Sequence, residues 1–107
     1  MAWTIEFLNA EVRAELDVLP VDIRASFERI ARLVQAFGLE HVHEPYIKHL
    51  DGQLWEMRLK GKDGIARALY VTAIGRRVIV VRVFVKKTQK TPPREIKLAA
   101  KRAKEVQ

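Results

Sequence analysis

Cysteine is absent from the 107-residue chain. Its absence excludes disulfide cross-links, thiolate nucleophiles and cysteine-ligated metal sites. No apolar run approaches the roughly 20 residues that a membrane-spanning helix needs. The opening segment MAWTIEFLNAEVRAEL lacks the basic and apolar regions of a signal peptide. We therefore expect a cytoplasmic protein with no membrane partner.

The signatures of several enzyme classes are also absent. There is no glycine-rich phosphate loop followed by a lysine, no nucleophile elbow and no HExxH pair. The three histidines, His41, His43 and His49, fall in one irregular stretch. Closely spaced loop histidines without a distant third ligand are usually solvated. We therefore expect no metal and no cofactor.

The chain is instead rich in charge, and the charge is unevenly distributed. It has 20 Lys and Arg, 13 Asp and Glu, a net charge of +7 and 49% hydrophobic residues, as expected for one soluble domain spanning residues 1–107. Residues 1–44 hold four basic and eight acidic residues, whereas residues 45–107 hold sixteen and five. This asymmetry favours a half that binds a polyanion, although a solvated basic surface would give the same totals.

The first 38 residues predict a strand followed by two helices. Residues 3–8 alternate between apolar and polar, as in a half-buried strand. Asn9 is a predicted helix N-cap, and Pro20 is expected to end that helix and begin the next one. The second helix is expected to end at Gly38. Its apolar stripe, which we expect to pack in the core, consists of Ile23, Phe27, Ile30, Val34 and Phe37.

The remaining chain predicts three strands and a helix. Residues 39–53 lose periodicity, which predicts a loop with at most a short extended piece. Residues 54–60, 65–73 and 77–87 read as strands joined by glycine-containing turns. Thr91 is expected to cap a last helix that has Pro92 and Pro93 in its first turn. The order βααβββα predicts an α+β fold: a small, mainly antiparallel four-stranded sheet packed on an N-terminal helical hairpin, with a C-terminal helix.

Strand alternation divides the expected sheet into two faces. In residues 77–87 we expect Ile79, Val81, Val83 and Val85 to face the core. Arg82, Phe84 and Lys86 then lie on the opposite face, where we also expect Arg58 and Lys60. The direction of Arg67 stays open at this stage.

Permanently cationic side chains dominate the expected sheet, whose only acids are Glu56 and Asp63. Such a cluster repels metal ions, but it binds phosphates and stabilises the additional charge of a pentacoordinate phosphorane. RNA supplies its own nucleophile, the 2′-hydroxyl group, so its cleavage needs orientation, charge stabilisation and proton transfer. Phe84 is a candidate for stacking an unpaired base. The candidate RNA-binding residues are Lys60, Lys62, Arg82, Phe84, Lys90 and Arg94.

Three segments carry a resemblance to a known family. They are LWEMR at residues 54–58, RALY at residues 67–70 and, most specifically, FVKKTQKTPPREI at residues 84–96. With them, nearly the whole chain resembles the phage-derived, HigB-like branch of the RelE toxin superfamily. The resemblance implies a type II toxin with a RelE-like fold that cuts mRNA on the ribosome and is neutralised by a cognate helix-turn-helix, HigA-like antitoxin.

The resemblance also implies roles for individual residues. Arg58 and Arg67 correspond to the family's phosphate and transition-state stabilisers, and Lys86 and Lys87 to the basic cluster that follows the last strand. Glu56 stands where better-known members have a lysine, and no tyrosine or histidine follows Tyr70. The general base is therefore unassigned, with His49 as a possible substitute.

Two other functions remain open from the sequence. The same basic face would suit a non-catalytic RNA- or DNA-binding module. It would also suit a domain whose main partner is an acidic protein.

Overall fold

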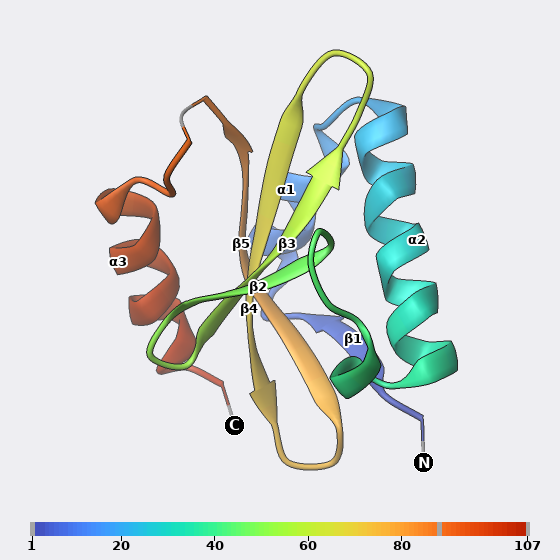
Figure 1. The fold of residues 1–107 in the computed structure, drawn as a ribbon. Coiled ribbons are helices and arrows are strands. Elements are labelled where there is room, and N and C mark those ends of the chain that lie inside the picture. Colours follow the sequence, from blue (N-terminus) through green and yellow to red (C-terminus); the bar gives the residue numbers. More distant parts are fainter. Residues whose placement is uncertain (1, 88, 107) are drawn as a thin grey trace.

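The computed structural model describes residues 2–87 and 89–106 of the chain, which form one sheet with helices on both faces (Figure 1). The elements, in chain order, are β1 (Thr4–Phe7), α1 (Ala10–Asp17), α2 (Val21–Phe37), a 3₁₀ turn η1 (Leu39–His41), β2 (Ile47–Asp51), β3 (Leu54–Lys60), β4 (Ile65–Ala73), β5 (Arg77–Lys86) and α3 (Pro93–Ala103).

The strands lie in the order β1-β5-β4-β3-β2. β1 runs parallel to β5, and the other neighbours are antiparallel. The predicted α+β class, the mainly antiparallel sheet and the flanking helices are confirmed. The sheet has five strands and not the expected four, because β2 forms within the segment that we expected to be a loop.

The sequence pattern does not predict β2, because this strand is short and few of its side chains are buried. Of its five residues only Ile47 is buried, and Ile47 lies opposite the fully buried Met57 of β3. Pairing with β3 therefore stabilises this strand more than its own alternation does.

Each face of the sheet has its own apolar cluster. One cluster joins α1 and α2 to β3, β4 and β5 through residues such as Ile30, Met57 and Tyr70. The other lies under α3 and includes Leu69 and Ala99. Figure 1 shows α2 and α3 on opposite sides of the sheet. With both faces packed, a binding site has to lie at an edge or an end of the sheet.

A β-bulge corrects the predicted facing of β5. Leu69 pairs with Arg82, and the next residue, Tyr70, pairs with Val80, so that Val81 is the extra residue. Ile79 and Val81 consequently join the cluster under α3, whereas Val83 joins the cluster under the helical hairpin. The expectation that Ile79, Val81, Val83 and Val85 share one core face was wrong; Val85 is also 46% exposed. Alternation cannot be read across a bulge.

Helix ends follow the sequence signals in three places and depart from them in one. The Asn9 side chain accepts a hydrogen bond from Val12 N at 3.0 Å. Pro20 precedes α2 directly, and Gly38 ends that helix with a φ of 90°. The predicted Thr91 cap was wrong, because Pro92 is the N-cap residue of α3 and the Thr91 hydroxyl group bonds elsewhere.

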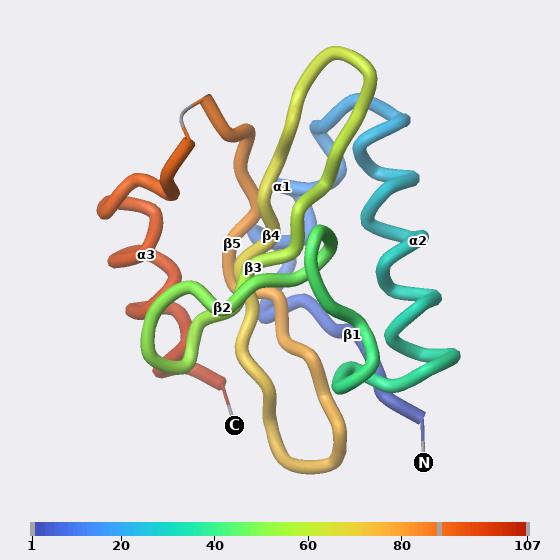
Figure 2. The backbone as a smooth tube through the Cα atoms, in the orientation of Figure 1, coloured from blue at the N-terminus to red at the C-terminus, as the bar shows by residue number. Residues whose placement is uncertain are grey.

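The tip of the β3–β4 hairpin rests on the start of α2 (Figure 2). The carboxylate of Asp22 accepts a hydrogen bond from Lys62 N at 2.7 Å, and Ser26 Oγ accepts one from Lys60 N at 3.3 Å. A Cβ atom at Gly61 would lie 2.7 Å from both Asp22 Oδ2 and the Cγ1 atom of Ile23. Glycine at this position therefore allows the hairpin to contact the helix.

We predict that Gly61→Ala lowers the free energy of unfolding by about 1–3 kcal/mol, because the added methyl group would lie too close to Asp22 and Ile23. Gly64→Ala, in the same loop, is the control, since a Cβ atom there meets nothing within 4 Å. Urea unfolding of both variants measures the difference. Equal stabilities would show that the hairpin tip does not press on α2.

Candidate nucleic-acid interface

A pocket of about 510 Å³ opens where the end of β3 meets α2, the segment that precedes β2 and the end of β5. We call it the basic pocket. Six cationic side chains line it, with no acidic residue among the described lining residues: Arg29, Lys48, Arg58, Lys60, Arg67 and Lys86. The remaining lining residues are Ser26, Pro45, Tyr46, Ile65 and Gln89. An anion is therefore the favoured ligand.

The register of the sheet places the central cations together. Arg58 of β3 lies directly opposite Arg67 of β4, which in turn lies opposite Phe84 of β5. Lys86 lies opposite Ile65, one pair further along the same face. The direction of Arg67, open from the sequence, is therefore the same as that of Arg58 and Lys86.

Two like charges directly opposite each other destabilise a sheet unless a counter-charge is near. Glu56, two residues before Arg58 on the same strand face, supplies it. Its Oε1 atom accepts a hydrogen bond from Arg67 Nη1 and lies 3.9 Å from Arg58 Nε. Glu56 and Arg67 are each only 3% exposed. This buried ion pair determines the position of the Arg67 guanidinium group.

The second oxygen of the Glu56 carboxylate anchors the segment between β5 and α3. Thr91 Oγ1 donates a hydrogen bond to Glu56 Oε2 at 2.8 Å. Both oxygens are thus occupied, one by the arginine and one by the threonine. The hydroxyl group that the sequence assigned to a helix cap instead connects this segment to the centre of the sheet.

Two guanidinium nitrogens of the pocket remain without a hydrogen bond. Arg58 Nε and Arg67 Nε are both buried and form no hydrogen bond within residues 2–87 and 89–106. Buried donors are nearly always paired in proteins, so an unpaired one commonly marks a ligand position. A phosphate oxygen is the natural acceptor for such donors.

The environment of Lys86 suits proton transfer. Burial, and then the charge of the neighbouring Arg67, lower the pKa of Lys86, although Glu56 opposes the shift. Burial also lowers the pKa of Arg67, against the opposing effect of Glu56. A lysine whose pKa is lowered towards neutrality gives up its proton more readily than a free lysine does.

Two predicted RNA-binding residues have structural partners instead. Arg82 forms ion pairs with Glu95 at 2.7 Å and with Glu15 at 2.9 Å. The ring of Phe84 is buried under α3, with the Arg82 guanidinium group 5.8 Å from its centroid. Phe84 is 8% exposed, so most of its ring is covered and the predicted stacking role is disfavoured, although the residue lines a depression with Lys87, Lys90 and Arg94.

The other candidates lie around the basic pocket. Lys60 lines it, whereas Lys87 lines an adjoining depression with Gln89. Lys90 and Arg94 lie with Lys87 along the segment that leads into α3. Lys62 lies at the hairpin tip, where its backbone is bound to α2. Apart from Lys60, none of these candidates is among the described residues that line the basic pocket.

His49 does not belong to the pocket. It pairs with Trp55, on the face of the sheet opposite Arg58, and its Nε2 atom lies 2.9 Å from Gly52 O. The imidazole ring packs edge-on against the Trp55 ring, with 5.0 Å between the centroids. The suggestion that His49 replaces the missing acid–base group is therefore wrong for this conformation.

The sequence reasoning missed four residues of the site. Arg29 comes from α2, and Tyr46 and Lys48 come from the segment that we expected to be a loop. No local pattern marks these three, because tertiary packing brings them to β3. Glu56 did carry a signal, since alternation placed it on the face of Arg58.

Among the described residues, no group of three or more His, Cys, Asp or Glu is arranged to hold a metal ion. None of the described helices has the length and apolar character needed to cross a bilayer.

The fold is that of the RelE toxins. The free-state structure of an arginine double mutant of the Escherichia coli toxin RelE superposes with a TM-score of 0.63 at 16% sequence identity, covering 95% of this chain and 98% of that chain. No curated protein matches the sequence significantly. The family model of the phage-derived protein Gp49-like matches residues 14–104, and the chain belongs to this family. The predicted phage-derived branch of the RelE superfamily is thus confirmed.

We predict that Glu56→Gln lowers the free energy of unfolding by about 3 kcal/mol, because the buried Arg67 loses its counter-charge. Glu6→Gln is the matched control, since Glu6 pairs with Arg77 in a half-exposed position. Surface pairs contribute little, so its effect is much smaller. Guanidinium unfolding gives both values, and similar losses for the two variants would contradict the assigned role of Glu56.

Proposed function

We propose that this protein is the toxin of a type II toxin–antitoxin pair and that it cuts mRNA on the ribosome. The main support is the convergence of Arg58, Arg67 and Lys86 in one pocket without an acidic lining residue. Membership of the Gp49-like family and the RelE-like fold favour the same conclusion. They do so by analogy, since one fold serves many functions.

The proposed reaction is a transesterification at phosphorus. The 2′-hydroxyl group passes its proton to water, its oxygen attacks the adjacent phosphorus atom, the bond to the 5′-oxygen breaks, and a 2′,3′-cyclic phosphate forms. Arg58 and Arg67 donate to the phosphate oxygens, which gain negative charge in the transition state. The hydrogen bond to Glu56 holds Arg67 in place before the RNA binds.

Lys86 is the proposed general acid. Its ammonium group protonates the departing 5′-oxygen, and its lowered pKa makes this transfer easier than for a free lysine. Lys87, which also belongs to the basic cluster after β5, is the second candidate. Glu56 is unsuited as the base that takes the 2′-hydroxyl proton, because both of its oxygens are already engaged.

Tyr46 replaces Phe84 as the proposed stacking platform. Among the described residues that line the basic pocket it is the one aromatic residue, and it is 39% exposed. Its carbonyl oxygen accepts a hydrogen bond from Arg58 N at 2.9 Å, which fixes the tyrosine beside the phosphate-binding arginine. A base stacked there would lie next to its own phosphate.

The proposed partners and location follow from the same assignment. The target is mRNA on the ribosome in the cytoplasm, and Lys60, Lys62, Lys87, Lys90 and Arg94 extend the cationic surface around the pocket towards the RNA. The proposed inhibitor is a helix-turn-helix, HigA-like antitoxin. A small helix-turn-helix gene beside this one would support that pairing.

We predict that expression of the chain alone arrests growth and that Lys86→Ala relieves the arrest. Loss of the acid should slow mRNA cleavage by roughly 100-fold or more. Arg58→Ala should have a similar effect, whereas Lys101→Ala, on the exposed surface of α3, should not. Primer extension on a translated message measures new 5′ ends, and circular dichroism confirms that each variant is folded.

Two results would contradict this mechanism. If Lys86→Ala and Arg58→Ala both stay toxic, the basic pocket is not the site. If the chain binds RNA with a steep salt dependence but produces no new 5′ ends, it is a non-catalytic RNA-binding module.

A separate prediction concerns Tyr46. Tyr46→Ala should weaken binding of a single-stranded RNA by about 1–3 kcal/mol, because one base loses its stacking partner. Tyr46→Phe keeps the ring and should bind as the unmodified protein does. Fluorescence anisotropy of a labelled oligonucleotide at fixed salt gives the affinities, and equal losses for the two variants would exclude stacking as the cause.

A further inference from the structure

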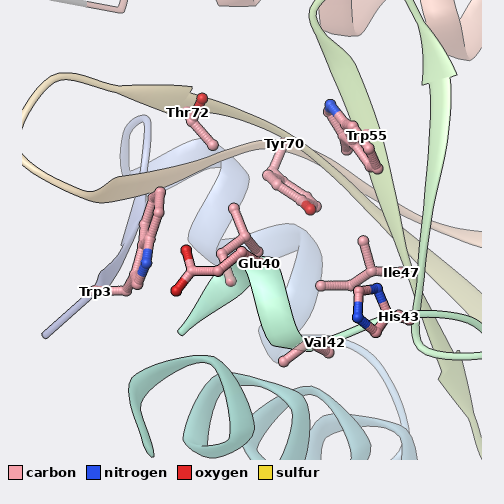
Figure 3. A pocket seen from close by; sticks show the side chains of 9 residues that line it. Trp3, Glu40, Val42, His43, Ile47, Trp55, Tyr70 and Thr72 are labelled. Atoms are coloured by element: carbon pink, nitrogen blue, oxygen red, sulfur yellow. The ribbon is translucent and has the colours of Figure 1, made fainter. Parts of the chain in front are cut away.

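A second pocket, of about 400 Å³, is lined by other residues and takes no part in the proposed reaction (Figure 3). We call it the aromatic pocket. The residues that carry its chemistry are Trp3, Glu40, His43, Trp55, Tyr70 and Thr72. Figure 3 shows Trp3 and Glu40 on one side, Trp55 and His43 on the other, and Tyr70 between them.

The strand residues of the two pockets point in opposite directions, and the pockets share none of the described lining residues. Trp55 lies directly opposite Tyr70, and this pair alternates with the Glu56–Leu69 pair. Side chains of neighbouring residues in a strand point to opposite faces. The Trp55–Tyr70 pair therefore lies on the helical-hairpin side, whereas Glu56 and Arg58 point to the other side.

The charge of the aromatic pocket is opposite to that of the basic pocket. Glu40 is its one acidic lining residue, and no lysine or arginine is found among the described residues that line it. Although the chain has a net charge of +7, the described residues that line this pocket offer no positive charge to bind a phosphate. The ligand it fits is a neutral planar group with polar edges.

Two polar groups of the pocket are available to a ligand. Trp3 Nε1 is buried and donates no hydrogen bond within the part of the chain that the structure describes. A buried indole N–H normally has an acceptor. The Glu40 carboxylate, an acceptor only, is exposed on the same side of the pocket. A ligand that binds both must present an acceptor and donors along one edge.

We propose that the aromatic pocket binds a guanine base. Its N1–H and N2–H₂ groups donate to the Glu40 carboxylate, and the neighbouring O6 atom, on the same edge of the base, accepts the Trp3 indole N–H. Its rings stack on the partly exposed indole ring of Trp55.

The carboxylate makes the pocket selective. Adenine has an acceptor, N1, where guanine has the N1–H donor, so it would place a lone pair against Glu40. Burying an unmatched acceptor costs about 1–3 kcal/mol, which corresponds to roughly a tenfold loss of affinity or more. Guanosine should therefore bind at least tenfold more tightly than adenosine.

The protein contains its own reporter for this test. Its two tryptophans, Trp3 and Trp55, both line the aromatic pocket, so a change in indole fluorescence reports on this pocket. Guanosine, which lacks a phosphate, is titrated with excitation at the red edge of the indole band and with a correction for absorption. We expect saturable quenching by guanosine and at least tenfold weaker quenching by adenosine.

Glu40→Gln and Glu44→Gln form a matched pair. Each removes one exposed carboxylate from the same segment, but Glu44 does not line the aromatic pocket. Glu40→Gln should lose at least tenfold in guanosine affinity, and Glu44→Gln should bind as the unmodified chain does. Thermal unfolding establishes that both variants are folded.

Three results would overturn the proposal. They are the absence of saturable quenching by guanosine, equal affinity for adenosine, and equal affinity of Glu40→Gln and the unmodified chain. None of them depends on mRNA cleavage, so failure here leaves the proposed toxin activity untouched.

Two oligonucleotides identify the source of the base. The pentamers UUGUU and UUAUU are titrated in the same way. Tighter binding of UUGUU than of guanosine means that the pocket takes a guanine from single-stranded RNA. Weaker binding means that it takes a free nucleoside.

Discussion

The buried ion pair between Glu56 and Arg67 is the interaction on which the basic pocket depends. Without a carboxylate at this position, Arg58 and Arg67 would face each other across two strands as uncompensated charges. Glu56 neutralises one charge, leaves the other for a ligand and binds Thr91, so that the same carboxylate positions the segment that enters α3. Glu56 is thus compatible with anion binding in the basic pocket, because its carboxylate binds Arg67 and Thr91 and is not among the described lining residues.

A second set of charges holds the helices and keeps Arg82 away from the pocket. At the β5 bulge, Arg82 binds Glu95 of α3 and Glu15 of α1. Arg102 of α3 also binds Glu15 and donates a hydrogen bond to Val81 O, at the extra residue of the bulge. These bonds connect α1 and α3 to each other and to β5. The cations near the sheet therefore form two groups, one that binds neighbouring helices and one that lines the basic pocket.

The sequence predicts what local patterns encode and misses what pairing decides. The helical hairpin followed from a 3.6-residue period, and the shared face of Arg58 and Lys86 followed from alternation on strands without a bulge between them. The bulge at Val81 leaves no local mark, so the facing of Val83 was predicted wrongly. Tyr46 reaches the site because β2, which follows it, pairs with β3. The residues of β2 have no clear strand pattern, so the sequence does not predict this pairing. Phe84 was misread because neither its burial under α3 nor the pairing of Arg82 follows from spacing.

The segment before and within β2 connects the two faces of the molecule. Val42, His43 and Ile47 line the aromatic pocket, whereas Pro45, Tyr46 and Lys48 line the basic pocket. Since Ile47 is buried against β3 and the Tyr46 carbonyl oxygen is bonded to Arg58, a shift of this segment changes both pockets together. The two pockets therefore share a physical connection although they share none of the described lining residues.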